Sequence, residues 1–293
     1  MIVRQLGHNH VEVLASAKLN LFLEILGRRG DGYHDLESLM VSVNLFDHLE
    51  FFDDPSGQIT LECDHPSLPT DASNLVIRAA AQLKAESGTD RGAKIVLRKS
   101  IPMQAGLAGG SSNAASTLVG LDRLWNLNHP KQTLEQLAAT IGSDVAFFLN
   151  TPAAICRGRG ELVEPLTIDR PLHFVLICPT VGVSTAEVYH RLIPPNNPGS
   201  IDTILEALKS GNSRALGQSL FNRLQPVAEA IEPSLVKVRK ALEELGPLLD
   251  GLLMSGSGST YFGLCRDEAA AGHAALILEP LGLGCAQVVT CRP

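Results

Sequence analysis

The chain has 293 residues, of which 45% are hydrophobic and 19% charged, so it can bury a substantial core and is not disordered. Its net charge of −7 argues against a nucleic-acid-binding protein, because such proteins usually carry a basic surface. No apolar run is long enough to cross a membrane, and the first residues lack the hydrophobic stretch of a signal peptide. The six cysteines include no Cys-x-x-Cys pair, which indicates reduced, mostly buried thiols and a cytoplasmic protein.

The first predicted element is a strand over residues 11–27, where apolar side chains alternate with others along the chain. Lys18 and Asn20 therefore share one face of this strand. A lysine in an otherwise apolar strand has two readings. It is either a functional ammonium, or an edge side chain whose stem covers apolar surface while its head reaches water. This stretch alone leaves both open.

A loop follows at Gly27–His34, where Asp-Gly is a turn signal. It presents an aromatic ring, a histidine and two arginines together, although by itself it is typical of an ordinary hairpin tip. Alternation then predicts a strand over residues 39–45 and a β-rich region over residues 51–63, with a turn at Pro55.

Two helices are expected on either side of the middle of the chain. The first covers residues 74–84 and is capped by Asp71 or Ser73, whose oxygens can accept from free backbone N–H groups. The second opens at Thr133–Gln136, which has the pattern of a capping box, and ends at Gly142.

Between those helices, the glycine- and serine-rich segment Pro102–Ser112 joins a predicted strand, residues 93–99, to a further predicted helix. The apolar face of that helix is formed by Ala114, Leu118, Leu121 and Trp125. Glycines let a ligand approach the backbone, and a helix N-terminus offers free N–H groups and a positive dipole end. We favour a phosphate site over a simple tight turn. The segment has neither the Walker pattern nor Gly-x-Gly-x-x-Gly.

Asp144 stands immediately before the apolar run Val145–Leu149. A carboxylate is costly to bury there without a partner. The residue can cap a helix, for which aspartate is well suited, and it can also direct an oxygen at a ligand. Lys18 is a natural partner for it.

Strands and helices continue to alternate to the end of the chain, which predicts a mixed α/β or α+β protein. A domain boundary is expected near Glu164–Arg170, where Pro165 and Pro171 stand, giving domains 1–165 and 166–293. A second glycine- and serine-rich loop covers Leu252–Thr260. The predicted strands are 153–156, 172–178, 261–265 and 287–290, and the predicted helices are 184–189, 201–208, 216–224, 233–245 and 268–278.

Three segments together resemble the motifs of the GHMP small-molecule kinases: residues 102–115 their phosphate motif, 255–258 their C-terminal glycine motif, and 15–21 their N-terminal motif. Within that superfamily, residues 17–21, 30–34 and 142–145 are similar to the branch that acts on 4-diphosphocytidyl-2-C-methyl-D-erythritol. The resemblance runs from about Ala15 to the end of the chain.

The resemblance implies an α+β, two-domain GHMP kinase fold with the active site in the cleft between the domains. It implies transfer of the ATP γ-phosphate to the 2-hydroxyl of this cytidine diphosphate-linked methylerythritol, a step of the non-mevalonate isoprenoid precursor pathway. The implied cofactors are ATP and Mg²⁺. The partner is the small-molecule substrate, with no nucleic acid or membrane, and the choice between monomer and homodimer stays open.

The same resemblance assigns roles to residues. Asp144 corresponds to the catalytic base and Lys18 to its electrostatic partner. The ATP-phosphate cradle corresponds to Pro102, Met103, Gln104, Ala105, Gly106, Leu107, Ala108, Gly109, Gly110, Ser111 and Ser112, and the C-terminal glycine loop to Gly256, Ser257 and Gly258. Asn20 and His34 correspond to substrate ligands, and Tyr33 and Tyr189 to the aromatic pair that stacks on the cytosine base. No metal ligand is assigned, although Ser111 or Ser112 can contribute a hydroxyl.

Three positions of the cradle vary within the family: Gln104, Ala105 and Ala108 stand where some members carry glycine. A positive φ at any of them would strain the side chain. Two alternatives stay open: another GHMP kinase acting on homoserine, mevalonate or a sugar, and a non-catalytic ATP-binding protein on this fold. An aromatic–histidine pair suits a nucleobase, and the presence of both Lys18 and Asp144 favours catalysis.

Overall fold

The computed structural model describes residues 1–150 and 152–293, which form two compact units. Unit 1 contains residues 1–17, 45–101 and 108–150, and unit 2 contains residues 18–44, 102–107 and 152–293. The chain therefore passes between the units several times, and each unit combines strands with helices, as expected of an α+β protein. The predicted domain limits at residues 165 and 166, and the predicted cleft between the domains, stay predictions.

The first sheet has two long strands, β2 and β3, and each of them has residues in unit 1 and residues in unit 2. Its strand order is β1-β2-β3-β5-β4, with β5 antiparallel to β3 and parallel to β4. The bounds are β1 Ile2–Gly7, β2 His10–Arg28, β3 His34–Asp54, β4 Ile59–Cys63 and β5 Gly92–Arg98. The predicted strands at 11–27, 39–45 and 93–99 are confirmed. Strand β1, which pairs with the start of β2, is an addition.

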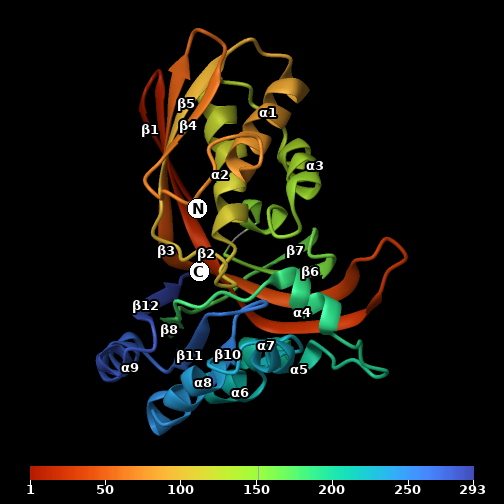
Figure 1. Ribbon diagram of the computed structural model, residues 1–293, viewed down its shortest axis with the longest axis vertical. Coiled ribbons are helices and arrows are strands. Elements are labelled where there is room, and N and C mark those ends of the chain that lie inside the picture. Colours follow the sequence, from red (N-terminus) through yellow and green to blue (C-terminus); the bar gives the residue numbers. More distant parts are fainter. Residues whose placement is uncertain (151) are drawn as a thin grey trace. The chain divides into compact units, whose positions relative to one another are not determined.

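Helices α1, α2 and α3 lie side by side along one side of the unit 1 strands (Figure 1). Their bounds, with the short 3-10 helix η1, are α1 Leu75–Ser87, α2 Gly109–Leu124, α3 Lys131–Ile141 and η1 Ala146–Leu149. The predicted apolar face of α2 is confirmed, since Ala114, Leu118 and Leu121 are fully buried. This packing fixes the position of the first turn of α2, where the glycine-rich segment ends.

The predicted caps of two helices are wrong. Asn74, not Asp71 or Ser73, caps α1, because its side chain accepts from the N–H of Val76, while the Asp71 carboxylate accepts from Ser73. Helix α3 begins at Lys131, so the proposed capping box at Thr133 lies inside it. Pro130, with its fixed φ, starts that helix without a side-chain cap.

Unit 2 is built on a second, antiparallel sheet of order β10-β11-β8-β12, with apolar side chains from α4, α7, α8 and α9 in its core. Its strand bounds are β8 Leu172–Cys178, β10 Gly251–Met254, β11 Tyr261–Cys265 and β12 Cys285–Cys291. Two further strands belong to the first sheet: β6 Ala153–Gly158 pairs with β3, and β7 Leu162–Leu166 pairs with β6. The helices are α4 Thr185–Arg191, α5 Asp202–Ser210, α6 Ser213–Gln218, α7 Gln225–Ile231, α8 Leu235–Glu243 and α9 Glu268–Leu278, with 3-10 turns η2 Gly246–Leu248 and η3 Glu279–Leu281.

The prediction of one helix over residues 216–224 is wrong. Helix α6 ends at Gln218, and β9, Phe221–Asn222, pairs in parallel with β2. Next along the chain, the Arg223 guanidinium donates two hydrogen bonds to the fully buried carboxylate of Glu24. A buried carboxylate needs such a partner, and this long-range requirement overrides the local helical pattern.

The cysteines of the chain are free thiols, and most are buried, as predicted. Burial raises the pKa of Cys178 to about 11, and of Cys265 and Cys291 to about 12. Cys285, at the start of β12, is exposed, and Cys63 is half-buried. Among the described residues, none of the helices combines the length and apolar character needed to cross a bilayer.

We predict that Gly120→Ala destabilises unit 1. A Cβ at Gly120, inside α2, would lie 2.5, 2.7 and 2.9 Å from three ring atoms of Phe51 on β3, and such overpacking costs about 1–3 kcal/mol. Urea denaturation gives the change in unfolding free energy. The matched control is Gly272→Ala in α9, where a Cβ meets nothing within 4 Å and helix propensity improves by up to about 1 kcal/mol. Equal effects of the two substitutions would contradict the prediction.

Candidate active site

Lys18 lies on β2 in unit 2, and its side chain begins a buried chain of hydrogen bonds. The residue is 3% exposed, and its Nζ donates to Oδ1 of Asn20. Nδ2 of Asn20 donates to the hydroxyl of Ser38 over 2.8 Å, and that hydroxyl donates to the carbonyl oxygen of Phe22 over 2.7 Å. The alternation along β2 had placed Lys18 and Asn20 on one face, and the structure confirms it.

This chain of hydrogen bonds has a fixed direction. Because the Ser38 hydroxyl gives its proton to a backbone carbonyl, it can only accept from Asn20, so the amide nitrogen must face Ser38 and the amide oxygen must face Lys18. The ammonium is therefore held inside the protein and does not extend to solvent, which disposes of the edge-lysine reading. Ser38 was not singled out in the sequence, because nothing local distinguishes it from other strand serines.

Two glycine-rich segments of unit 2, residues 102–107 and 255–260, lie beside Lys18 and are hydrogen-bonded to each other. The backbone N–H of Lys18 donates to the carbonyl of Leu107 over 3.2 Å. The Ser255 hydroxyl donates to the carbonyl of Gly106 over 3.0 Å, and the N–H of Thr260 donates to that of Ala105 over 3.2 Å. The first half of the predicted phosphate cradle, Pro102–Leu107, is thus joined to the C-terminal glycine loop by its backbone.

Glycine is required where these segments approach most closely. Gly106 has φ +75°, and a Cβ there would overlap the carbonyl oxygen of Ser255. Gly256 has φ +56°, and a Cβ there would lie 3.1 Å from Nζ of Lys18. The side chain of Asn222, on β9, secures the same loop by donating to the carbonyl of Gly256 over 2.7 Å. The loop therefore presents backbone, not side chains, to the lysine.

Two of the three positions that depart from the glycine pattern do adopt left-handed backbone. Gln104 has φ +52° and Ala108 has φ +53°, whereas Ala105 does not have a positive φ. A residue with a Cβ is strained in this region by about 1–2 kcal/mol. The possibility of strain raised by the sequence is realised at Gln104 and Ala108, on either side of Gly106.

The second half of the cradle, residues 108–112, opens α2 in unit 1. Ser112 is fully buried, and its hydroxyl has no hydrogen-bond partner among the described residues. An unpaired buried hydroxyl at a helix N-terminus, where free N–H groups and the positive dipole end are found, suits an anionic or metal-bound ligand. Ser111 and Gly110, beside it, are half-buried and exposed.

A buried ion pair lies beneath this helix start. Lys99 Nζ pairs with the Asp47 carboxylate, and both side chains are at most 5% exposed. The other oxygen of Asp47 accepts from the N–H groups of Ser100 and Ile101 over 2.8 Å each. A Cβ at Gly109 would lie 3.1 Å from Lys99 Nζ, so this cation lies beside the first residue of α2. The sequence analysis did not predict this pair. The available signal was a lysine directly after β5, in alternation with the apolar residues Ile95 and Leu97.

Asp144 lies in unit 1, in the turn between α3 and η1, and is half-buried. It does not cap η1, which begins after Val145 without a side-chain cap. Its carboxylate is therefore not assigned to holding the end of a helix, and the ligand-directed reading of this residue is the one that stays.

The aromatic residues predicted to bind a base are in unit 2. Tyr33 is 53% exposed at the end of the β2–β3 loop. The His34 ring packs at 5.5 Å from the ring of Tyr189, on α4. Burial, together with the charge of Arg28, lowers the pKa of His34 below its ordinary value of 6.5, so its imidazole is neutral at pH 7. A neutral imidazole has one donor and one acceptor, as base recognition requires.

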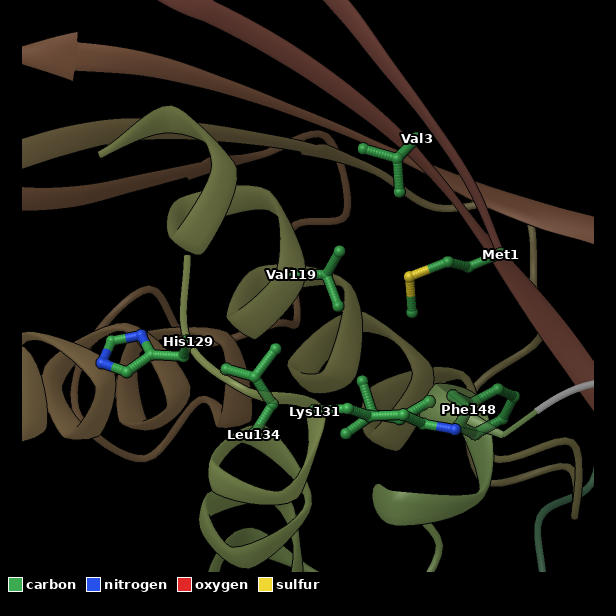
Figure 2. Close-up of a pocket in the computed structure, with 8 residues that line it drawn as sticks. Met1, Val3, Val119, His129, Lys131, Leu134 and Phe148 are labelled. Atoms are coloured by element: carbon green, nitrogen blue, oxygen red, sulfur yellow. The ribbon is translucent and has the colours of Figure 1, made fainter. Parts of the chain in front are cut away.

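Unit 1 also contains a cavity of about 380 Å³ (Figure 2). Figure 2 shows apolar side chains from β1, α2 and α3 directed toward it, with Lys131 at its border. Its lining residues are Met1, Val3, Val119, His129, Lys131, Leu134, Phe148 and Leu149. None of them belongs to the predicted site, so this hollow is not the candidate active site.

Comparisons with known proteins give a consistent family. Residues 74–156 match the GHMP kinases N terminal domain, and residues 204–279 match the GHMP kinases C terminal domain. The chain is 44% identical to a 4-diphosphocytidyl-2-C-methyl-D-erythritol kinase of Pelotomaculum thermopropionicum, over 90% of this chain and 92% of that protein. It is 40% identical to one of Exiguobacterium sibiricum, over 87% and 89%.

Solved structures agree. A crystal structure of 4-(cytidine 5'-diphospho)-2C-methyl-D-erythritol kinase covers 96% of this chain and 99% of its own, with a TM-score of 0.79 and 37% identity. A homoserine kinase from Cytophaga hutchinsonii has a TM-score of 0.76 at 19% identity, covering 99% and 96%, and shares the fold. The expected α+β GHMP kinase fold is thereby confirmed.

We predict that Ala108→Gly stabilises the protein by about 1 kcal/mol, because glycine adopts the left-handed backbone of this position without strain. The free energy of unfolding in urea measures it. Ala105→Gly is the matched control: this buried residue has no positive φ, so the same change should destabilise the protein. A loss of stability at position 108 equal to that at 105 would show that position 108 is not strained.

Proposed function

We propose that this chain, which belongs to the 4-diphosphocytidyl-2-C-methyl-D-erythritol kinase family of the GHMP kinases, transfers the γ-phosphate of ATP to the 2-hydroxyl of 4-diphosphocytidyl-2-C-methyl-D-erythritol. The observation that carries the proposal is the identity of 44% to a relative of that name over nine-tenths of the chain. The step belongs to the non-mevalonate route to isoprenoid precursors, and we expect it in the cytoplasm.

Asp144 is the general base of the proposed reaction. Its carboxylate accepts the proton of the substrate 2-hydroxyl while the hydroxyl oxygen forms a bond to the γ-phosphorus. The bond between that phosphorus and the oxygen bridging to the β-phosphate breaks, and ADP leaves. A half-buried carboxylate with no capping role supports this assignment.

Lys18 is the electrostatic partner in the proposed mechanism. Its ammonium favours the ionised form of a nearby carboxylate and offsets negative charge on the transferring phosphoryl group. The support is its burial and the oriented hydrogen bond to Asn20, which fix the cation in place before substrate binds. Phosphoryl transfer depends mainly on such positioning and charge stabilisation. Asn20, the proposed substrate ligand, also orients the Lys18 ammonium through this hydrogen bond.

The segment Pro102–Ser112 holds the phosphates of ATP in this proposal. Backbone N–H groups at the start of α2 donate to phosphate oxygens, and the positive end of the helix favours their charge. Lys99, beside Gly109, adds to the positive potential there, although Asp47 offsets much of it. Gly106 and Gly256 let this segment and the C-terminal loop approach each other and Lys18 closely, because neither residue carries a side chain.

We also propose that Mg²⁺ accompanies ATP. In the described part of the chain no three His, Cys, Asp or Glu side chains form a metal-binding group. Mg²⁺ commonly binds through substrate phosphates with only one or two protein groups, so the residues fit it. Ser112, with its unpaired buried hydroxyl, and Ser111 are the groups that would hold it. The chemistry that Mg²⁺ would supply there is neutralisation of the negative charge on the phosphates during transfer.

Recognition of the cytidine part is assigned to the aromatic residues of unit 2. Tyr33 and Tyr189 stack on the base, and neutral His34 hydrogen-bonds to its edge. The packing of His34 against Tyr189 supports a common binding surface. Stacking supplies affinity that any base would gain, whereas the hydrogen bonds to His34 select cytosine.

The test of the function is ADP release from ATP and Mg²⁺ with 4-diphosphocytidyl-2-C-methyl-D-erythritol, with homoserine, mevalonate and galactose as alternative acceptors. Turnover with the cytidyl substrate alone is expected. Turnover with another acceptor would refute the assigned substrate, and ATP binding without transfer to any acceptor would refute the enzymatic assignment.

We predict that Asp144→Asn lowers kcat by about 10²–10⁴-fold, the usual contribution of a general base, with little change in the KM for ATP. Steady-state kinetics with the cytidyl substrate measures both constants. Asp90→Asn, at an exposed position of unit 1, is the control and should behave as the unaltered enzyme. Near-normal turnover of the Asp144 variant would remove this residue from the role of base.

We predict that the KM for the cytidyl substrate is constant above pH 7 and rises at lower pH. The pKa of His34 lies below 6.5, so the imidazole is mostly protonated only below that pH. The protonated ring has no acceptor nitrogen, and its positive charge is repelled by that of Arg28. His34→Asn keeps a donor and an acceptor but does not titrate. A rise of KM that persists in this variant would assign the pH dependence to another group.

A further inference from the structure

Arg159 lies beside the exposed ring of Tyr33. It belongs to the turn at Gly158–Glu161 between β6 and β7, and β6 pairs with β3 in a register that places Leu36 opposite Gly158. This pairing brings the turn to the start of β3, where the base-binding loop ends. The central carbon of the guanidinium lies 4.9 Å from the centroid of the Tyr33 ring, within the range of a cation–π contact.

Glu161, in the same turn, holds Arg159 in place. The carboxylate of Glu161 accepts from the backbone N–H of Arg159 over 2.6 Å and lies 3.8 Å from its Nε. Gly158, with φ +70°, gives room for this carboxylate, since a Cβ there would lie 2.9 Å from it. The turn is therefore closed by its own side chain, and the guanidinium is about one-third exposed.

The backbone of Tyr33 is fixed by hydrogen bonds within its own loop. Its N–H donates to Asp31 over 3.1 Å, and its carbonyl accepts from Arg29 over 2.8 Å. Its side chain remains 53% exposed. An exposed aromatic ring samples several rotamers, and a cation on one face restricts it to the rotamers that keep the contact.

We propose that Arg159 is a positioning residue of the base-binding site: it covers one face of the Tyr33 ring and fixes the ring so that the opposite face receives the cytosine base. The inference rests on the proposed function, which assigns Tyr33 to base stacking. Arg159 acts on the affinity for the cytidyl substrate through Tyr33, and takes no part in phosphoryl transfer.

The test is steady-state kinetics of Arg159→Gln. The KM for the cytidyl substrate should rise by about two- to five-fold, the range expected for a partly exposed cation–π contact, with kcat and the KM for ATP unchanged. Arg159→Lys keeps the charge without the flat guanidinium, so its KM for the cytidyl substrate should lie between those of the unaltered enzyme and of Arg159→Gln. Arg157→Gln is the matched control, because Arg157 is two residues away and pairs with Glu37 and Glu164 instead.

A double-mutant cycle tests whether Arg159 acts through the ring. In a Tyr33→Leu background, Arg159→Gln should cause no further rise in KM, because the ring is absent. In a Tyr33→Phe background the ring persists, so the rise should persist as well. Equal effects of Arg159→Gln in all three backgrounds would overturn the proposed route through Tyr33.

Other outcomes also overturn the inference. An unchanged KM in Arg159→Gln would show that the contact does not position the ring, and a lower KM would show that arginine and base compete for one face. Either result leaves the proposed function standing, provided the unaltered enzyme turns over the cytidyl substrate. If the unaltered enzyme does not, the proposed function itself fails and this inference fails with it.

Discussion

The burial of the Lys18 ammonium is the constraint that organises the candidate site. A buried cation is stable only if protein groups replace its water, and the oxygen of Asn20 is one such group. That oxygen faces the lysine because Ser38 occupies the amide nitrogen and passes its own proton to the carbonyl of Phe22. Three side chains on two paired strands thus form one directional unit, whose orientation ends in the backbone of the sheet.

The same lysine sets demands on the backbone around it. The carbonyl of Leu107 accepts from the backbone N–H of Lys18 on β2, and residues 255–260 bond in turn to the carbonyls of Ala105 and Gly106. This is possible because Gly106 and Gly256 lack side chains at the closest approaches. Gln104 and Ala108 accept left-handed backbone on either side of Gly106. Local strain of about 1–2 kcal/mol at each is offset by the hydrogen bonds that the segment makes, so the path of the segment is imposed by its surroundings and not by its own residues.

Sequence periodicity predicted β2, β5, α2 and α9, because apolar residues recur in each at the spacing of its strand or helix and so mark the buried face. It failed where a partner distant in sequence decides the outcome. Residues 221–223 form β9 and an ion pair to Glu24, although their local pattern favours a helix. Strand pairing brings Ser38 to Asn20 and Arg159 to Tyr33, and no local pattern reveals either contact. Lys18, Asp144 and the cradle stood out because charge or glycine interrupts apolar sequence.

The raised pKa values of the buried cysteines have a chemical consequence. A thiol reacts with alkylating agents and disulfides as its thiolate, and Cys178, Cys265 and Cys291 hold almost none at neutral pH. Cys285, exposed on the first residue of β12, is open to solvent, with half-buried Cys63 next in access. The native protein therefore offers Cys285, on the small sheet of unit 2, as its most accessible point of attachment for a maleimide dye, and Cys63 is the one partly accessible cysteine to replace.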